Sequence, residues 1–219
     1  MDIVMELDRG LRAVDLAKQL ETVDGIPGIF ERARKGQNFA LLMKLSEHFR
    51  CSNNEIRGSI AKALNKALID PSVQADEIVK RLIMVWESND VYARAHVLDV
   101  FTALSLILGN SVEAHYRVMQ SLYSDYEVEF EAATNAALAL SKSSFGRFVV
   151  MAFDAVLYRI DQSQSDSFIV DTLLQVLVEG ARQPVVAPIV YQYVKSFGKS
   201  EHLASMKANN IILDTQIDD

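Results

Sequence analysis

The sequence predicts an all-α fold: an α-solenoid of stacked antiparallel helix pairs, similar to HEAT or armadillo repeats. Half of the 219 residues are hydrophobic, and glycine and proline are few, which suits helices packed around a continuous core. Apolar residues recur at helical spacing, whereas the period-two alternation that marks strands is scarce. A helix–turn–helix unit also repeats at intervals of 37 and 35 residues, slightly shorter than the usual HEAT period of about 40–47 residues.

The repeated unit is clearest over residues 76–108, where two helices flank the polar turn Glu87–Asp90. Asp90 can cap the second helix by accepting hydrogen bonds from its unpaired backbone N–H groups. Arg94 follows one helical turn later, and we expect it to reach the carboxylate and carbonyl groups of the turn. The second helix is apolar over a wide arc, so neighbouring helices must cover it on more than one side.

The polar turn recurs once before and once after this unit. In the first copy an Asn-Asn pair precedes Arg57, 37 residues before Arg94. In the third copy an aspartate precedes Glu129, 35 residues after Arg94; this copy has no arginine at that position, so its turn must be satisfied differently. The turn residues are therefore predicted to order one edge of the stack and are the candidate interface residues: Asn53, Asn54, Arg57, Asn89, Asp90, Arg94, Asp125 and Glu129.

The first third of the chain contains four predicted helices. Apolar residues at helical spacing predict a helix over residues 2–21. Glycine and proline then interrupt the pattern, so a short helix over 29–35 follows and ends at a glycine. The next pair is 39–50, with leucine and phenylalanine on its inner face, and 55–68, which Pro71 follows closely.

The helix pair within 76–108 comes next, and a pair at 112–123 and 127–141 follows it. The helix over 127–141 is rich in alanine, and small side chains let a neighbouring helix approach closely, so we predict that it lies centrally in the stack.

Three further helices complete the predicted domain. A clean apolar stripe predicts a helix over 145–160, and a polar loop separates it from a second amphipathic helix over 168–181. Prolines make the start of the last helix, 187–197, irregular. No long linker divides the chain, so we predict one domain over residues 1–206 and a frayed or docked tail over residues 207–219.

The net charge of −7 and the pI near 5.2 disfavour a protein whose binding depends on phosphate contacts. Five basic residues nevertheless lie in one region, and some of them are at the end of a predicted helix, where positive charge interacts favourably with the helix dipole. They are Arg32, Arg34, Lys35, Lys44 and Arg50. A single cysteine indicates a reducing compartment. With no signal peptide or membrane-spanning stretch, we expect a soluble intracellular protein without a membrane partner.

Residues with catalytic potential are dispersed. The four histidines form no metal-binding spacing, and no glycine-rich phosphate loop is present. The acidic run from Asp125 to Glu131 fits a helix N-terminus, or part of a contact surface for a basic partner. Four aromatic residues near helix–turn junctions either close the repeats or serve as binding hot spots: Trp86, Tyr92, Tyr123 and Tyr126. We predict no enzyme, no cofactor, no metal ion and no small-molecule substrate.

Several segments resemble a known family in their order and spacing. ELDRGLR at 6–12 stands first, the turn with the pattern FRxxNNxxR lies at 49–57, and IVKRLIxVWxSNDxxAR lies at 78–94. SLYSDYEVEFEAATNAALALS at 121–141 continues the match. Together they are similar to the N-terminal region of the Integrator complex subunit 7 family, over roughly residues 5–160.

The resemblance implies a non-catalytic helical scaffold that binds other subunits of a nuclear complex. That complex processes the 3′ ends of small nuclear RNAs and attenuates transcription by RNA polymerase II, and contact with the polymerase or a phosphatase would be indirect. Family members are several times longer, so we expect either an N-terminal fragment or a short relative. One alternative is a general adaptor that docks a kinase, phosphatase or helicase in an unrelated complex. Another is direct nucleic-acid binding through the local cations, which the net charge disfavours.

Overall fold

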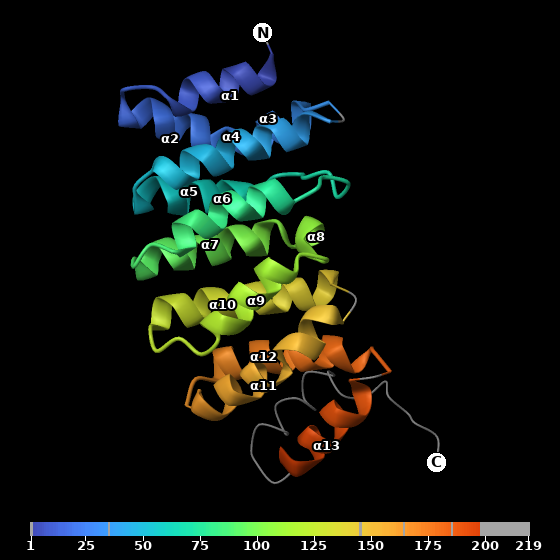
Figure 1. The fold of residues 1–219 in the computed structure, drawn as a ribbon. Helices are drawn as coiled ribbons and strands as arrows, with labels where there is room; N and C mark the ends of the chain where they lie inside the picture. The colour runs from blue at the N-terminus through green and yellow to red at the C-terminus, as the bar shows by residue number, and fades with distance from the viewer. Residues whose placement is uncertain (1, 35, 145, 164, 185, 198–219) are drawn as a thin grey trace.

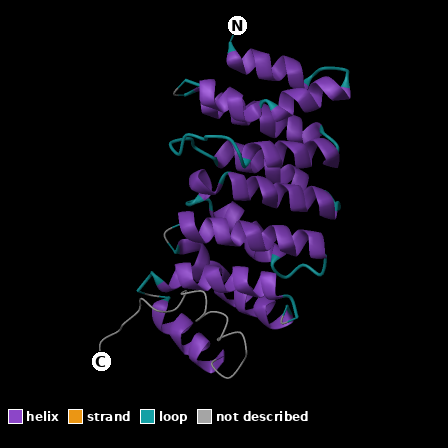
Figure 2. Cartoon of the chain, turned by 180° about the vertical axis from the view of Figure 1, so that it is seen from behind, coloured by secondary structure: helices purple, strands orange, loops and turns teal. Residues whose placement is uncertain are grey.

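The protein is a stack of α-helices, as the sequence predicts. The computed structural model describes residues 2–34, 36–144, 146–163, 165–184 and 186–197, and within these ranges it contains thirteen helices and no strand (Figure 2). The helices lie roughly crosswise to the stack, with α1 at one end and α13 at the other (Figure 1). The predicted all-α solenoid is therefore confirmed.

The helices are α1 (Ile3–Leu11), α2 (Leu16–Asp24), α3 (Ile26–Arg32), α4 (Gln37–Cys51), α5 (Asn54–Leu64), α6 (Asp76–Trp86), α7 (Val91–Ala103), α8 (Ser105–Leu108), α9 (Val112–Ser121), α10 (Glu127–Ser143), α11 (Arg147–Gln162), α12 (Ser167–Ala181) and α13 (Ala187–Phe197).

The stack has two layers. In the first layer α2, α5, α7, α10 and α12 pack on one another in succession. In the second layer α1, α4 and α6 pack in succession, α9 packs on α11 farther along, and α13 packs on α12. The turns that lead from the second layer into the first lie together along the left side of Figure 1, and we call this side the turn edge. It brings segments about 35 residues apart next to each other.

The first predicted helix, over residues 2–21, is wrong, because α1 and α2 are separate. Asp15 ends the connection by capping α2: its carboxylate accepts a hydrogen bond from the backbone N–H of Ala17 at 3.0 Å. The two helices then pack so closely that a Cβ atom on Gly10 would overlap the side chain of Thr22. A capping aspartate inside an apolar pattern thus makes a helical hairpin rather than one long helix.

Other boundaries also differ from expectation. The helix predicted over 29–35 is α3, which spans Ile26–Arg32, and the helix predicted over 55–68 is α5, which ends at Leu64. The second helix of the pair within 76–108 breaks at Leu104 into α7 and the short α8. The helix predicted over 145–160 begins only at Arg147, because Gly146 precedes it with a positive φ of 81°, a conformation that favours glycine. The predicted tail, residues 207–219, lies outside the described residues.

The core is continuous through both layers, and α7 and α10 meet at its centre. Val97, Leu98 and Phe101 of α7 are fully buried, as the wide apolar arc of this helix requires. The alanines at 133 and 136 of α10 are also fully buried. The small residues of α10 therefore allow close packing with α7 on one side and α12 on the other, which confirms its predicted central position.

One tight contact depends on a glycine at the end of α8. A Cβ atom on Gly109 would lie 2.6 Å from the backbone carbonyl oxygen of Ser143, at the end of α10, whereas a Cβ atom on Gly28 in α3 would meet nothing within 4 Å. We expect Gly109→Ala to lower the free energy of unfolding by about 1–3 kcal/mol, because the backbone must shift. Gly28→Ala, measured alongside by urea denaturation, should be neutral or stabilising by up to about 1 kcal/mol. Equal effects of the two changes would contradict this close approach.

The pH dependence of stability should depend on a histidine in the core. His115 is buried, and its ring lies edge-on to Phe148 with ring centroids 5.6 Å apart. Burial lowers the pKa of His115, a backbone hydrogen bond at Leu108 opposes this, and the Arg147 guanidinium lowers it further. The unfolded chain therefore binds the proton more readily, and stability present above the ordinary histidine pKa of about 6.5 is lost as the pH falls below it.

Replacement by an apolar residue should remove this contribution. We expect His115→Leu to reduce the loss of unfolding free energy between about pH 7 and about pH 5. Burial also lowers the pKa of His48, so the single variant should retain a smaller pH dependence that a second change, His48→Leu, reduces further. Urea titrations at several pH values measure both, and an unchanged slope in His115→Leu would contradict the assignment.

Candidate functional site

The candidate residues lie along the turn edge, and the first of them fix the turn between α4 and α5. Asn53 caps α5 by accepting a hydrogen bond from the backbone N–H of Ile56 at 3.0 Å. Arg57 donates to the carbonyl oxygens of Phe49 at 3.0 Å and Arg50 at 3.2 Å, and to Oδ1 of Asn54 at 3.0 Å. The guanidinium therefore satisfies the last carbonyl groups of α4, which have no partner within the helix.

The next contact joins this turn to the turn between α6 and α7. Nδ2 of Asn54 donates to Oδ2 of Asp90 at 2.8 Å, across 36 residues of sequence. The other carboxylate oxygen of Asp90 accepts hydrogen bonds from the first N–H groups of α7, those of Tyr92 and Ala93. The hydrogen bond from Asn54 is the main cause of a lowered pKa for Asp90. Asn89, beside it, is exposed.

Arg94 makes its main contacts in the following repeat and not in its own turn. Its Nε and Nη2 donate to the same Oε2 atom of Glu129, at 3.1 and 2.8 Å, and these bonds raise the pKa of Arg94. Only a long hydrogen bond, 3.5 Å, reaches the carbonyl of Ser88. The expectation that Arg94 binds the Asp90 carboxylate is therefore wrong. Asn54 occupies that carboxylate, and Glu129 offers Arg94 a more buried partner.

Glu129 is buried, and its carboxylate is satisfied from three directions. Besides Arg94, the hydroxyl of Ser121 donates to Oε1 at 2.8 Å and the hydroxyl of Ser124 donates to Oε2 at 3.1 Å. The exposed fractions are 17% for the Arg94 side chain and 5% for the Glu129 side chain. A charge this far from solvent persists only with such partners, so the pair fixes α10 against α7 at the turn edge.

The third turn, which has no arginine of its own at the repeat position, receives one from α11. Nε and Nη2 of Arg159 donate to the carbonyl oxygens of Leu122 and Ser124, both at 2.6 Å. Its guanidinium also lies 4.4 Å from the ring centroid of Phe130. Burial lowers the pKa of Arg159, although charge at Tyr158 and Asp125 opposes this. Asp125, a predicted site residue, is exposed beside this contact.

Sequence reasoning missed Arg159 because it comes from the first helix of a pair, whereas Arg57 and Arg94 come from the second. A usable signal exists, since Arg159 stands among the buried positions Val156 and Ile160 on the inner face of α11. An arginine within an apolar stripe needs buried acceptors, and the carbonyl groups of a turn supply them.

The aromatic residues at the junctions divide into two groups. Trp86 is buried in the core, so it closes the repeat. Tyr92, Tyr123 and Tyr126 are exposed at the turn edge, with exposed fractions of 59%, 45% and 59%. Of the four predicted aromatic residues, these three are available for contact with a partner.

The basic cluster is largely neutralised by carboxylates. Arg32 pairs with Glu6 at 3.3 Å, Lys44 pairs with Asp8 at 3.1 Å, and Arg50 pairs with Glu47 at 2.7 Å. Arg34 is exposed, and Lys35 lies outside the described residues. These ion pairs reduce the positive potential that a nucleic-acid surface needs.

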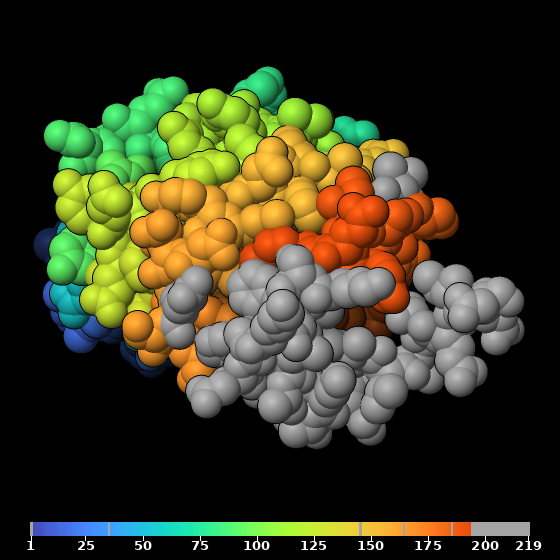
Figure 3. Space-filling model, turned by 90° about the horizontal axis from the view of Figure 1, so that it is seen from below, coloured from blue at the N-terminus to red at the C-terminus, as the bar shows by residue number. Residues whose placement is uncertain are grey.

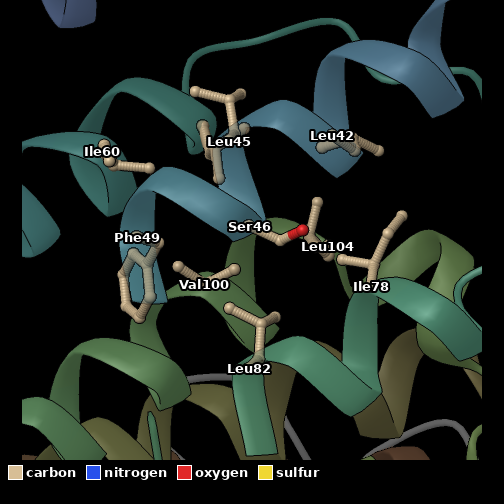
Figure 4. A pocket seen from close by; sticks show the side chains of 10 residues that line it. Leu42, Leu45, Ser46, Phe49, Ile60, Ile78, Leu82, Val100 and Leu104 are labelled. Atoms are coloured by element: carbon tan, nitrogen blue, oxygen red, sulfur yellow. The ribbon is translucent and has the colours of Figure 1, made fainter. Parts of the chain in front are cut away.

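A hollow between α4, α5, α6 and α7 belongs to the core. Nine apolar side chains and Ser46 line it (Figure 4). The hydroxyl of Ser46 already donates to the backbone carbonyl of Met43 at 3.0 Å, so the lining directs no free polar group at a ligand. Among the described residues no group of His, Cys, Asp and Glu side chains is arranged to hold a metal ion, and no helix combines the length and apolar character needed to cross a bilayer.

The buried pair predicts a large and specific stability effect. We expect Arg94→Ala to lower the free energy of unfolding by about 3–5 kcal/mol, because it leaves the Glu129 carboxylate buried without a cation. Adding Glu129→Gln to this variant should restore part of the loss. Arg117→Ala breaks an ion pair of α9 with Glu113, whose side chain is 51% exposed, so it should cost less than about 1 kcal/mol. Thermal and urea unfolding measure all three; equal losses for the two single variants would contradict the assignment.

Comparison with known proteins agrees with this architecture. Two engineered helical repeat proteins of known crystal structure are similar in fold, with TM-scores of 0.60 and 0.58 at 15% and 16% sequence identity. The first similarity covers 94% of this chain and 89% of the other, and the second covers 88% and 87%. At these identities the likeness concerns the fold alone.

Sequence relatives identify the family. The chain is 36% identical over 148 residues to Integrator complex subunit 7 of Danio rerio and of Homo sapiens, and 30% identical over 152 residues to that of Drosophila melanogaster. These matches cover 64–65% of this chain, which spans 15% of the length of each relative. The family model described as Integrator complex subunit 7, N-terminal, matches residues 4–179, so the similarity continues past residue 160 through most of α12. The chain therefore belongs to the Integrator complex subunit 7 family, in which it corresponds to the N-terminal region.

Proposed function

We propose that this chain is a non-catalytic scaffold of an Integrator-type complex in the nucleus and that it binds other subunits of that complex. The observation that carries the proposal is the family match over residues 4–179, which takes in α1 to α11 and most of α12. Because these helices share one continuous core, they support a single repeat domain as the binding unit.

The finer role in the proposal is assembly of a machine that processes small nuclear RNA 3′ ends and attenuates transcription by RNA polymerase II. The scaffold contributes by holding helix faces and turns at fixed positions. The contacts from Asn54 to Asp90 and from Arg94 to Glu129 support this, because they tie successive repeats together at the turn edge. A surface ordered before binding loses less conformational entropy when a partner docks.

An adaptor of an unrelated complex, docking a kinase, phosphatase or helicase, is the second candidate. The fold suits it equally well, since α-solenoids present extended binding surfaces. Family membership favours the Integrator-type partner, and the identity of the bound proteins separates the two candidates.

Affinity capture tests the proposal. The tagged full chain is incubated with nuclear extract of the organism that makes it, and bound proteins are identified by mass spectrometry. We expect enrichment of Integrator subunits over a bait of the same fold, for which either engineered helical repeat protein serves. Recovery of a kinase, phosphatase or helicase without Integrator subunits would support the adaptor. Equal recovery of Integrator subunits on both baits would count against specific assembly.

A further inference from the structure

We propose that the turn edge is a docking surface for an arginine-rich segment of a partner protein. The surface consists of five exposed aromatic side chains, which we call the aromatic edge: Tyr92, Tyr123, Tyr126, Tyr158 and Phe168. This inference deepens the proposed scaffold function and rests on it, because it specifies the chemistry of a partner segment.

The aromatic edge is built from three successive turns. Tyr92 stands in the first turn of α7, Tyr123 and Tyr126 lie between α9 and α10, and Tyr158 and Phe168 flank the turn between α11 and α12. The rings of Tyr123 and Tyr158 pack with their centroids 4.9 Å apart, so the second and third turns form one surface. In the space-filling view the segments of these two turns adjoin at the left side of the molecule (Figure 3).

The exposure of these aromatic rings indicates a protein-binding surface. Phe168 is 68% exposed, and the two tyrosines at the ends of the middle turn are 45% and 59% exposed. Aromatic side chains gathered on one edge are the residues that dominate binding energy at protein interfaces, since they bury a large area for few rotatable bonds. Scattered apolar residues would need no explanation, but a row along one edge does.

The charge of the edge is complementary to a cationic segment. Glu87, Asp125 and Glu127 are exposed in the same turns as the tyrosines. In the segments 86–94, 120–131 and 156–170 the sequence contains two cations, Arg94 and Arg159. Both point inward, because Arg94 is bound to the buried Glu129 and Arg159 to two carbonyl groups of the turn. The outer surface of these turns is therefore aromatic and negative.

Arginine fits this combination better than lysine. Its planar guanidinium stacks on aromatic rings and at the same time donates hydrogen bonds to carboxylates. The chain itself already makes an arginine–aromatic contact at this edge: the Arg159 guanidinium, which donates to backbone carbonyl groups, lies 4.4 Å from the ring centroid of Phe130 and 5.8 Å from that of Tyr158. A partner arginine would find the same chemistry on the outward rings.

Peptide binding to the purified full chain tests the proposal. The probes are two fluorescein-labelled peptides of equal length and charge. One alternates arginine with glycine, and the other alternates lysine with glycine. Fluorescence anisotropy measures the affinity of each peptide for the chain. We expect the arginine peptide to bind about three- to tenfold more tightly than the lysine peptide. We expect the double variant Tyr123→Ala/Tyr126→Ala to weaken its binding about tenfold.

Matched controls separate a site from general attraction to an acidic protein. Tyr116 is 47% exposed on α9, away from the turn, so Tyr116→Ala should leave the affinity unchanged. The double variant Glu87→Gln/Glu127→Gln should weaken binding of the arginine peptide. The control Glu21→Gln/Glu31→Gln removes the same amount of charge from exposed positions outside the aromatic edge, and it should leave the affinity unchanged. Since Tyr123 packs on Tyr158, melting curves accompany each variant, and the two carboxylate pairs keep the test decisive if the tyrosine variant unfolds.

The outcomes are distinct. Equal affinity for both peptides, together with equal effects of the edge and control variants, would overturn the docking surface and leave only attraction to the net charge of −7. That result is compatible with capture of Integrator subunits from extract, and failed capture is compatible with peptide binding. Failure of this inference and failure of the proposed function are therefore distinguishable.

Discussion

The buried pair of Arg94 and Glu129 is the interaction on which the turn edge depends, because the two charges come from different repeats and neither can stay inside alone. Removing a carboxylate from water costs several kcal/mol, and the cost is offset only by close opposite charge and complete hydrogen bonding. Arg94 supplies the opposite charge to Glu129, and the hydroxyls of Ser121 and Ser124 donate hydrogen bonds to its carboxylate oxygens. The pair thereby fixes the distance between α7 and α10 at the turn edge. Along the rest of the two helices, the buried alanines of α10 fix this distance.

Two turns along this edge, those between α6 and α7 and between α9 and α10, are completed by groups from other repeats, and helix geometry explains why. The last carbonyl and first N–H groups of a helix lack partners within it, and a short turn offers few of its own. Asn54 reaches forward to Asp90, Arg94 reaches forward to Glu129, and Arg159 reaches back to the carbonyl of Leu122. Stability in such a stack is a sum of terms between neighbours, so a lost contact weakens the adjoining repeats most.

The local pattern of the sequence predicts the fold and the position of the turn residues, but not which partner each side chain selects. Asp90 caps α7 as its place before an apolar run requires, because capping is a local interaction. The choice of Glu129 over Asp90 by Arg94 depends on burial, which arises only when repeats stack. Arg159 lies outside the repeated pattern because it comes from the first helix of a pair, although its place in the apolar stripe of α11 is a local signal. The break between α1 and α2 has a local signal, because Asp15 is a capping residue inside an apolar pattern. That signal alone does not distinguish a hairpin of two helices from one long helix.

The inward and outward halves of the turn edge are chemically linked. Since Arg94 and Arg159 are bound inside the stack, the exposed acids Glu87, Asp125 and Glu127 give the outer side of these turns its negative charge, and the rings beside them are left outside. Held by helices whose ends are fixed, these rings lose little freedom when a partner docks, which favours affinity without a large interface. The interactions that make the repeats rigid are thus the same ones that give their outer edge its aromatic and acidic character.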